Sequence, residues 1–596
     1  MKKLALVLAV VMVLSLGLTA CGGSTSSTGT ASSAPAGSSS SGSASDAAPA
    51  YNPDALQVKA LDDNTLQVTL TARTPYFLEL TAFPAYAPVQ QATVEANGEA
   101  WAVDAATYIG NGPYKIAEWV PSSHITMVKN ENYWNVDSLA GPDTLQFTLM
   151  EDDAAQLTAF QSGELDFIDA VPNDEIDALS STPEFYKEGQ IGTYYVSYNT
   201  QAAPFDDPLV RQAFTLAVDR DYICKQIGKS GQIPAGAFVS EGLSDAAEGS
   251  SFREVGGDYY DPTAGANEAN LAKAKELLAE AGYPNGEGLP TITYLYNEGT
   301  AHQQIGEALQ QMWGQLGATV TLESQEWATF LNTRKNGDYQ VARNGWLGDY
   351  NDPISFLDMW ITGGGNNDAQ WSNAEFDSLI KQIKSSGDAE ASMEMMHQAE
   401  DIIFDEWMLC PIYYYVDIYM AQQNLENLST SPLGFKFFMN ASNGTDTLKV
   451  CTGPDPDTID PALNSAVDGG TMIDHAFEGL YTVAYGTTPT PGQAESVEIS
   501  EDGLTYTFHL REGLKWSDGT PLTAHDFVYS WQRAVDPATG ADYAYMFECI
   551  AGYTEAINGE EYVAPAADAS SASTSESAAE SVSASTSESA STSAAA

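Results

Sequence analysis

The chain has 596 residues, and its 81 Asp and Glu residues outnumber its 24 Lys and Arg residues, which gives a formal net charge of −57. This charge argues against nucleic-acid binding, because phosphate contacts need clustered Lys and Arg, and against adsorption to anionic lipid headgroups. We interpret it as a solvated surface. A hydrophobic content of 43% allows large buried cores, and such a length corresponds to roughly three or four domains.

The beginning of the chain predicts export. A basic stretch at 1–3 precedes an apolar run over 4–18, whose length suits a signal peptide better than a membrane span of about 20 residues. The run ends in Leu-Thr-Ala-Cys, which resembles the lipobox of bacterial lipoproteins. We therefore expect a lipoprotein signal peptide at 1–21 and lipidation of Cys21. The alternative is an ordinary cleaved signal with an incidental cysteine.

Low-complexity segments flank a globular body. Residues 22–50 are rich in Ser, Gly and Ala and predict a flexible tether. Residues 563–596 are rich in Ser and Ala and predict a disordered tail. We expect a protein held on the outer face of the cell membrane by its lipid, extracellular in a Gram-positive-type cell and periplasmic otherwise.

The body alternates between strand and helix periodicities. Apolar residues at every second position over 66–70 predict a strand. Residues 270–281 predict an amphipathic helix that ends at Gly282. A strand at 291–296, a helix at 301–316 and a strand at 318–323 follow. This βαβ order predicts a mixed α/β fold.

Enzyme motifs are missing from the sequence. We find no H-E-x-x-H, G-x-S-x-G or P-loop motif. The six histidines lack metal-ligand spacing, and the five cysteines form no C-x-x-C pair or disulfide framework. We therefore expect no catalytic residues, no cofactor and no metal.

Several long motifs resemble one family. E-I-S-E-D-G-L-T-Y-T-F-H-L-R at 498–511 and L-K-W-S-D-G-T-P-L-T-A-H-D-F-V-Y-S-W-Q-R at 514–533 are similar to the signature of family 5 extracellular solute-binding proteins. These are the oligopeptide-, dipeptide- and nickel-binding components of ABC importers. Further similar segments lie at 112–115, 132–134, 210–220 and 345–357, and 325–343 resembles the oligopeptide-binding subgroup. The resemblance implies a two-lobed, type II periplasmic-binding-protein fold with three domains.

The order of these segments differs from the family order. The part resembling 447–560 comes first in the family, and the part resembling 51–445 follows it. The chain therefore resembles a circular permutant joined through 440–447, with the tether and the tail as the two halves of one cut surface loop. The alternatives are an error in the gene model or assembly and a rearranged gene without function.

The resemblance divides the globular body into three domains. The small domain is expected from 483–562 followed by 51–91. The large ligand-binding lobe is expected at 192–414. The hinge domain is expected from 92–191 together with 415–482, which includes the permutation junction.

The resemblance also implies charged anchors for a peptide. It places Asp349 against the ligand ammonium, and Arg334, Arg343 and His302 against the ligand carboxylate. The ordinary alternatives are a solvated acid for Asp349, salt bridges within a lobe for the arginines and a surface position for His302. A charge-assisted hydrogen bond to such an anchor contributes roughly 1.5–3 kcal/mol.

The remaining expected contacts are aromatic or come from the backbone. Aromatic cleft positions are matched by Trp327, Trp346, Tyr415 and Tyr543, for which core packing is the alternative. Gly345 and Leu347 would present backbone groups to the peptide. Val467 is retained, whereas Ser465 stands where the family can offer an acid. On this basis Asp349 is the only acidic anchor that we can name.

We expect a membrane-anchored, monomeric lipoprotein whose two lobes close on an oligopeptide and deliver it to ABC permease subunits. Alternative ligands are a dipeptide, a nickel chelate or another small solute such as a sugar. A surface or sensor lipoprotein without transport is a rival of another class. An exported hydrolase is a third, but the sequence offers no nucleophile–base arrangement for it.

Overall fold

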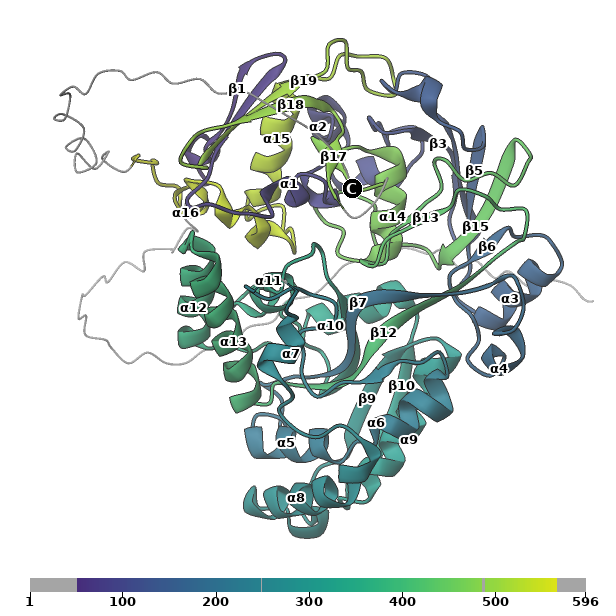
Figure 1. Cartoon of the computed structure of the whole chain (residues 1–596), viewed down its shortest axis with the longest axis vertical. Coiled ribbons are helices and arrows are strands. Elements are labelled where there is room, and N and C mark those ends of the chain that lie inside the picture. The colour runs from purple at the N-terminus through teal and green to yellow at the C-terminus, as the bar shows by residue number, and fades with distance from the viewer. Residues whose placement is uncertain (1–50, 248, 485–487, 565–596) are drawn as a thin grey trace, which may run out of the picture. The chain divides into compact units, whose positions relative to one another are not determined.

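The computed structural model describes residues 51–247, 249–484 and 488–564 (Figure 1). The predicted signal peptide, its cysteine, the tether and all but the first two residues of the predicted tail lie outside this part. The helices are α1 Phe77–Leu80, α2 Gln91–Asn97, α3 Asp153–Gln161, α4 Ile176–Leu179, α5 Pro208–Leu216, α6 Arg220–Tyr222, α7 Phe252–Gly256, α8 Asn267–Glu280, α9 Thr300–Gly314, α10 Trp327–Lys335, α11 Ile354–Leu357, α12 Ala374–Ser385, α13 Ala389–Asp405, α14 Val467–Ala476, α15 Ala524–Val535 and α16 Tyr553–Asn558.

An 11-stranded mixed sheet is the largest element of the described chain. Its strands follow the order β10-β9-β11-β7-β12-β6-β15-β5-β4-β3, and β8 pairs with β12. In that order the bounds are Val320–Gln325, Ile292–Asn297, Val341–Leu347, Phe185–Tyr198, Leu409–Ala421, Phe167–Ile168, Thr447–Gly453, Thr144–Leu149, His124–Lys129 and Tyr114–Val120, with β8 at Ile233–Pro234. The long strands β7 and β12 pair antiparallel along most of their length and form its centre.

A four-stranded antiparallel sheet joins the two ends of the described chain. Its order is β1-β2-β19-β18, with bounds Val58–Asp62, Thr65–Thr69, Thr505–Leu510 and Ala494–Ile499. Leu66 and Val68 are buried, as the two-residue period predicts, and β2 lies against β19 from the far end of the sequence. Two short hairpins, β13–β14 (Ser429–Thr430, Lys436–Phe437) and β16–β17 (Tyr481–Thr482, Thr490–Pro491), complete the strands.

The strand β15 lies inside the large sheet, between β5 and β6, and runs parallel to both. It is reached through a hydrogen-bonded turn, in which Oδ1 of Asn443 accepts from the backbone N–H of Thr445 at 2.9 Å and Gly444 has a φ of 81°. That φ value favours glycine. The connection over 440–447 is therefore an ordered part of the fold.

The two ends of the described chain lie side by side. The side-chain amide of Asn52 donates to the carbonyl oxygen of Glu560 at 2.6 Å, and the backbone N–H of Asn52 donates to Ala556 at 2.9 Å. The hydroxyl of Tyr51 donates to the carbonyl of Gln532 at 2.6 Å. Residues close to both ends are thus held against α15 and α16.

The predicted βαβ unit is confirmed with small shifts of its boundaries. The strands β9 and β10 are parallel neighbours joined by α9. The predicted helix at 270–281 is α8, which buries Ala274, Leu277 and Leu278. Gly282 follows it with a φ of 94°, as a glycine C-cap requires.

The four cysteines within the described chain, Cys224, Cys410, Cys451 and Cys549, are free and buried. Within this part of the chain, no helix combines the length and apolarity that a membrane crossing needs. The same part holds no group of three or more His, Cys, Asp or Glu residues arranged to bind a metal ion.

Candidate functional site

A cavity of about 490 Å³ lies among the large sheet, α9, α10 and α14. All twelve residues that the sequence resemblance assigns to ligand binding line it: His302, Trp327, Arg334, Arg343, Gly345, Trp346, Leu347, Asp349, Tyr415, Ser465, Val467 and Tyr543. Their location in one cavity agrees with the predicted site. Their individual environments differ, and these differences decide which of them are free to bind a ligand.

Asp349 follows β11 and has no cationic partner among the described residues. Tyr543 donates a hydrogen bond to its Oδ1 at 2.8 Å, and the hydroxyl of Ser355 lies 3.4 Å from its Oδ2. Burial raises the pKa of Asp349 well above its ordinary value, and the nearby carboxylate of Asp358 acts in the same direction. The two hydrogen bonds only partly offset this effect, so Asp349 favours a ligand that brings its own positive charge.

Arg343, on β11, is the cation of the cavity without an acidic partner in the described chain. Its Nη2 donates to the hydroxyl of Tyr415 at 3.4 Å, and its guanidinium lies over the rings of Tyr194 and Trp327, 5.2 and 6.0 Å from their centroids. Its buried Nε has no hydrogen-bond partner among the residues that the structure describes. This half-buried guanidinium is therefore available to an anionic group.

His302 stands beside Arg343 but supplies no second cation. Its Nδ1 lies 3.2 Å from the hydroxyl of Tyr194. Burial lowers the pKa of His302 well below its ordinary value, and the charge of Arg343 lowers it further. His302 is consequently a neutral hydrogen-bonding group at pH 7, rather than the cation that the sequence reasoning assumed.

Arg334 also lines the cavity, but its guanidinium already forms an ion pair. Its Nε lies 2.6 Å from Oδ2 of Asp368, which also accepts a hydrogen bond from the side chain of Asn344 at 3.1 Å. The salt bridge that we weighed as the alternative is therefore present for Arg334 and absent from the described contacts of Arg343. Of the two arginines, Arg343 is thus the one whose charge has no acidic partner in the described part of the chain.

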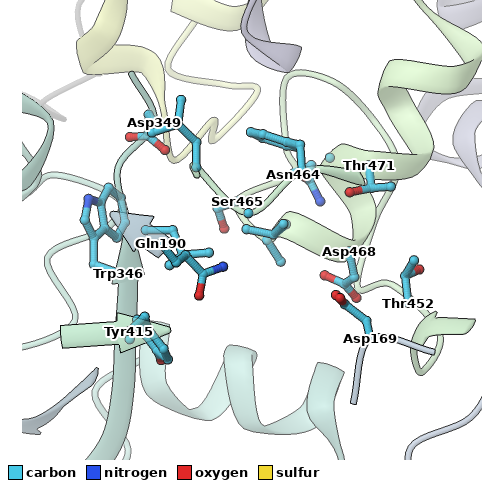
Figure 2. A pocket seen from close by; sticks show the side chains of 18 of the residues that line it. Asp169, Gln190, Trp346, Asp349, Tyr415, Thr452, Asn464, Ser465, Asp468 and Thr471 are labelled. Atoms are coloured by element: carbon cyan, nitrogen blue, oxygen red, sulfur yellow. The ribbon is translucent and has the colours of Figure 1, made fainter. Parts of the chain in front are cut away.

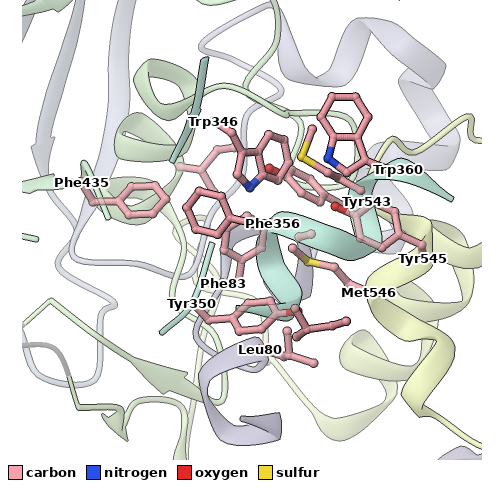
Figure 3. Close-up of a cluster of buried hydrophobic side chains, with 14 of the residues drawn as sticks. Leu80, Phe83, Trp346, Tyr350, Phe356, Trp360, Phe435, Tyr543, Tyr545 and Met546 are labelled. Carbon is pink, nitrogen blue, oxygen red and sulfur yellow. The ribbon is translucent and has the colours of Figure 1, made fainter. Parts of the chain in front are cut away.

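Several aromatic residues that line the cavity, among them Phe83, Trp346 and Tyr543, also belong to a buried hydrophobic cluster (Figure 3). The ring of Tyr543 lies 5.0 Å from that of Phe83 in an edge-to-face arrangement and 6.3 Å from that of Trp346. The indole N–H of Trp346 donates to the carbonyl of Ser355 at 2.8 Å. Residues from three distant parts of the chain thus hold the surroundings of Asp349 in place.

The strand β11 offers a free backbone edge to the cavity. One edge pairs with β7 along 341–347, but the other pairs with β9 only at Val341 and Ala342. From Arg343 onward this second edge has no strand partner within the described chain. Gly345 is needed here, because a Cβ atom would overlap the hydroxyl of Tyr415. Such an edge can pair with an extended peptide.

The sequence reasoning missed several acids of the cavity. Asp169, Asp417 and Asp468 also line it, so Asp349 is not its only acidic group. Figure 2 shows Asp169 and Asp468 together on the side of the cavity away from Asp349. Asp468 directly follows Val467, and this adjacency was the only sequence signal that could have revealed it.

Ser465 precedes α14 and sits near an acid that the sequence did not indicate. Its hydroxyl donates to Oδ2 of Asp542 at 3.0 Å, and the same oxygen lies 2.5 Å from Nζ of Lys335. The negative charge of Asp542 is therefore already paired with Lys335, so the polar contact made by Ser465 adds no free acidic anchor.

A mixed α/β fold that encloses a cavity with unpaired groups of both charges is typical of proteins that bind a small charged solute between layers of secondary structure. The model of the bacterial extracellular solute-binding proteins, family 5 Middle, matches residues 27–368 and 488–586. The chain belongs to this family, whose members are solute-binding transport proteins rather than enzymes.

Characterised relatives support this assignment. The dipeptide-binding protein DppE of Bacillus subtilis is 37% identical over 385 residues, which cover 64% of this chain and 69% of DppE. The oligopeptide-binding protein OppA of the same species is 35% identical over 400 residues, 65% of this chain and 71% of OppA.

Solved structures share the type II periplasmic-binding-protein fold. OppA of Haemophilus influenzae, in complex with the peptide RPPGFSPFR, matches with a TM-score of 0.57 and 29% identity over 62% of this chain and 71% of that one. The murein tripeptide binding protein MppA of Escherichia coli matches with a TM-score of 0.57 and 31% identity over 64% of this chain and 72% of that one.

Proposed function

We propose that this protein binds oligopeptides in the cavity beside β11 and delivers them to the permease of an ABC importer. The observation that carries the proposal is that Asp349 and Arg343 line one cavity and that neither forms an ion pair with another described residue. A peptide is a zwitterion in an extended chain, so its ammonium suits Asp349, its carboxylate suits Arg343 and its backbone suits the free edge of β11. The names of the relatives, which refer to dipeptides and oligopeptides, agree with such a ligand.

The remaining site residues have supporting roles in this proposal. Trp327, Trp346, Tyr415 and Tyr543 surround peptide side chains, and Gly345 and Leu347 present backbone groups. His302 donates or accepts a neutral hydrogen bond, Arg334 keeps Asp368 in place, and Ser465 and Val467 complete the lining of the cavity. No chemical step is part of this function.

The proposal includes the setting of the protein. Acylation of Cys21 would hold it on the outer face of the membrane, where a monomer with two closing lobes would meet its permease. The domains would be those expected from the resemblance, with 192–414 as the large lobe. The four-stranded sheet, built from 58–69 and 494–510, supports a small domain assembled from both ends of the body.

We further propose that the chain is a circular permutant of the family. The family model matches in two separate segments, and the junction at 440–447 is an ordered turn that leads into the middle of the large sheet. Asn52 and Glu560, near the two ends of the body, are hydrogen-bonded to each other. Old termini joined by a short turn and new termini that are adjacent are the conditions under which permutation is tolerated.

Native mass spectrometry of residues 22–596, purified without denaturation, tests the proposed function. We expect a set of bound masses that fragment into short peptides. A folded protein that stays empty after incubation with a mixture of two- to six-residue peptides would contradict peptide binding. A broad distribution of high charge states would mean that the permuted chain does not fold.

A further inference from the structure

A second polar region of the cavity lies away from Asp349. Asp169 directly follows β6, and Thr452 lies near the end of β15. The residues before them, Ile168 and Cys451, are parallel partners, so the two side chains start from neighbouring strands. Asp468, in the first turn of α14, faces them, and Figure 2 shows its carboxylate pointing towards that of Asp169.

The negative charges of this region exceed its positive charge. The ammonium of Lys436 lies 2.8 Å from Oδ2 of Asp417 and 3.5 Å from Oδ1 of Asp169, so two acids share one cation. No cation lies within ion-pair distance of Asp468 in the described chain. Two units of negative charge are consequently left without a protein partner beside the cavity.

Several polar atoms of the same region lack hydrogen-bond partners. Oδ2 of Asp468 and Oγ1 of Thr452 are buried and form no hydrogen bond with any described residue. Asn297, which is only 9% exposed, also has an unpaired Oδ1 and lines the cavity. Asn297 pairs in register with Gln325, two residues before Trp327. The indole of Trp327 is close enough to the Asp468 carboxyl to lower its pKa. Buried acceptors without donors favour a ligand that supplies donors.

We propose that this region, comprising Asp169, Thr452 and Asp468, is a subsite for a basic side chain of the bound peptide. The proposal rests on the peptide-binding function proposed above. The termini of a peptide would neutralise Asp349 and Arg343, and a peptide that also carries an alkylammonium or guanidinium group would neutralise the excess charge that remains. The protein would thus select peptides with a positively charged residue.

The composition of the subsite favours an organic cation. Its free atoms are acceptors, and an ammonium or guanidinium supplies several donors at once. The described chain offers no cluster of metal-ligating residues here, which argues against an inorganic ion. Burial raises the pKa values of Asp169 and Asp468 to about 6, so both carboxyls are mostly ionised at pH 7 and become fully so beside a bound cation.

Isothermal titration calorimetry with tetra-alanine derivatives tests the subsite. Lysine, arginine or uncharged norleucine is placed at the second or the third position, and each peptide is titrated into the wild type, Asp468→Asn and Asp474→Asn. Asp474 is the matched control, because it lies on the same helix but does not line this cavity. Thr452→Val is a second variant that leaves the charge unchanged.

We expect at least one basic peptide to bind about ten- to a hundredfold more tightly than its norleucine counterpart. Asp468→Asn should abolish this preference, Thr452→Val should reduce it and Asp474→Asn should preserve it. The basic residue that gives the larger increase in affinity, lysine or arginine, identifies the preferred cation. Equal affinities for basic and norleucine peptides, or a preference unaffected by Asp468→Asn, would overturn the subsite while leaving peptide binding intact. Failure of the folded wild type to bind any of the peptides would overturn both proposals.

Discussion

The hydroxyl of Tyr543 donates a hydrogen bond of 2.8 Å to Asp349, although 194 residues separate them in the sequence. Asp349 lies two residues after β11 of the large sheet, whereas Tyr543 belongs to the segment that follows α15. The proposed ammonium anchor is therefore held jointly by two distant parts of the chain. The orientation of Asp349 therefore depends on the relative position of these two parts of the chain.

Replacement of Asp349 by alanine tests the ammonium anchor. We expect peptides with a free N-terminus to bind about ten- to a hundredfold more weakly, because a charge-assisted hydrogen bond is lost. The affinity for N-acetylated peptides should change little, since they carry no ammonium. Calorimetry on both peptide forms makes the comparison, and equal losses for the two would refute the anchor role. Tyr543→Phe keeps the carboxylate of Asp349 and removes only its hydrogen bond, so it should weaken peptides with a free N-terminus to a smaller extent.

The two arginines of the cavity should respond differently to substitution by glutamine. Arg343→Gln should weaken peptides with a free carboxylate more than their amides and leave the melting temperature nearly unchanged. Arg334→Gln should instead lower the free energy of unfolding by about 3–5 kcal/mol, because Asp368 would lose its buried partner. Urea unfolding and titration of both peptide forms separate the two effects. A carboxylate-specific loss for Arg334→Gln alone would reverse our assignment.

Peptide affinity should rise with pH across the acidic range. The pKa of Asp349 is raised well above 3.8 in the empty cavity, mainly by burial. An ammonium binds the ionised carboxyl, so binding releases a proton wherever the empty form is protonated. The affinity for a peptide with a free N-terminus should therefore fall as pH drops through the raised pKa. The acetylated peptide, titrated between pH 5 and 8, should show a much smaller dependence, and identical pH profiles for the two would contradict this linkage.

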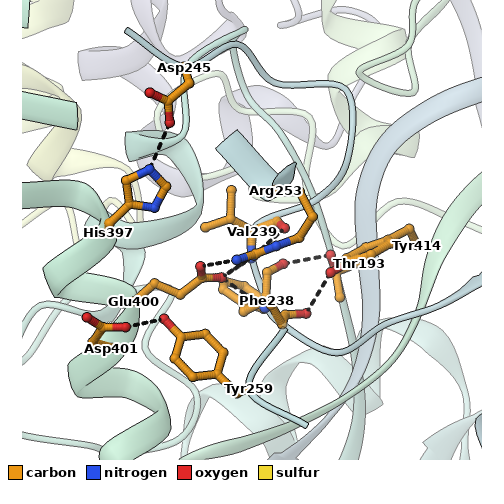
Figure 4. A network of polar contacts seen from close by, with 11 residues as sticks. Thr193, Phe238, Val239, Asp245, Arg253, Tyr259, His397, Glu400, Asp401 and Tyr414 are labelled. Carbon is orange, nitrogen blue, oxygen red and sulfur yellow. Dashed lines mark hydrogen bonds and ion pairs between the residues drawn. The ribbon is translucent and has the colours of Figure 1, made fainter. Parts of the chain in front are cut away.

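A buried ion pair stabilises the part of the fold around β7 and α13 (Figure 4). Both oxygens of Glu400 bind the guanidinium of Arg253, at 2.8 and 2.9 Å, and Oε1 also accepts the backbone N–H groups of Phe238 and Val239. Glu400→Gln should reduce the free energy of unfolding by about 3–5 kcal/mol, because it leaves the buried charge of Arg253 unpaired.

The matched control for Glu400→Gln is Asp401→Asn, the same type of change at the next residue of α13. Asp401 accepts one hydrogen bond from Tyr259, at 2.7 Å, on the exposed side of the helix. The free energy of unfolding of this variant should differ from that of the wild type by less than about 1 kcal/mol. Chemical unfolding of both variants provides the test. Similar losses for the two would show that the buried pair contributes no special stability.

If the chain is a circular permutant, as we propose, it can be reconnected in the family order. A variant in which 445–562 precede 51–443, with a short Gly/Ser linker between residues 562 and 51, should fold with a similar melting temperature and bind peptides equally. A control variant opened within β15, at Val450, should fail to fold, because it interrupts the middle of the large sheet. Loss of folding in the first variant would contradict the proposed relationship.

Sequence reasoning located the residues of the cavity better than it described their electrostatics. The period of two over 66–70 and the βαβ pattern around α9 are local signals, and both elements formed as expected. The pairing of Arg334 with Asp368 has no local signal, because it depends on how a helix packs against a loop. The meeting of Asp169 and Asp468 depends likewise on the parallel alignment of β6 with β15.

The insertion of β15 between β5 and β6 also constrains the order of folding. During synthesis, β5 and β6 emerge roughly 300 residues before the strand that separates them, as the positions 144–168 and 447–453 require. Until then each of them has an edge without its final partner, and such edges can pair with other chains. Completion of the large sheet is thus a late, non-local event, which slows folding. A chain interrupted before residue 447 would lack both the completed sheet and the cavity residues Asp468 and Tyr543.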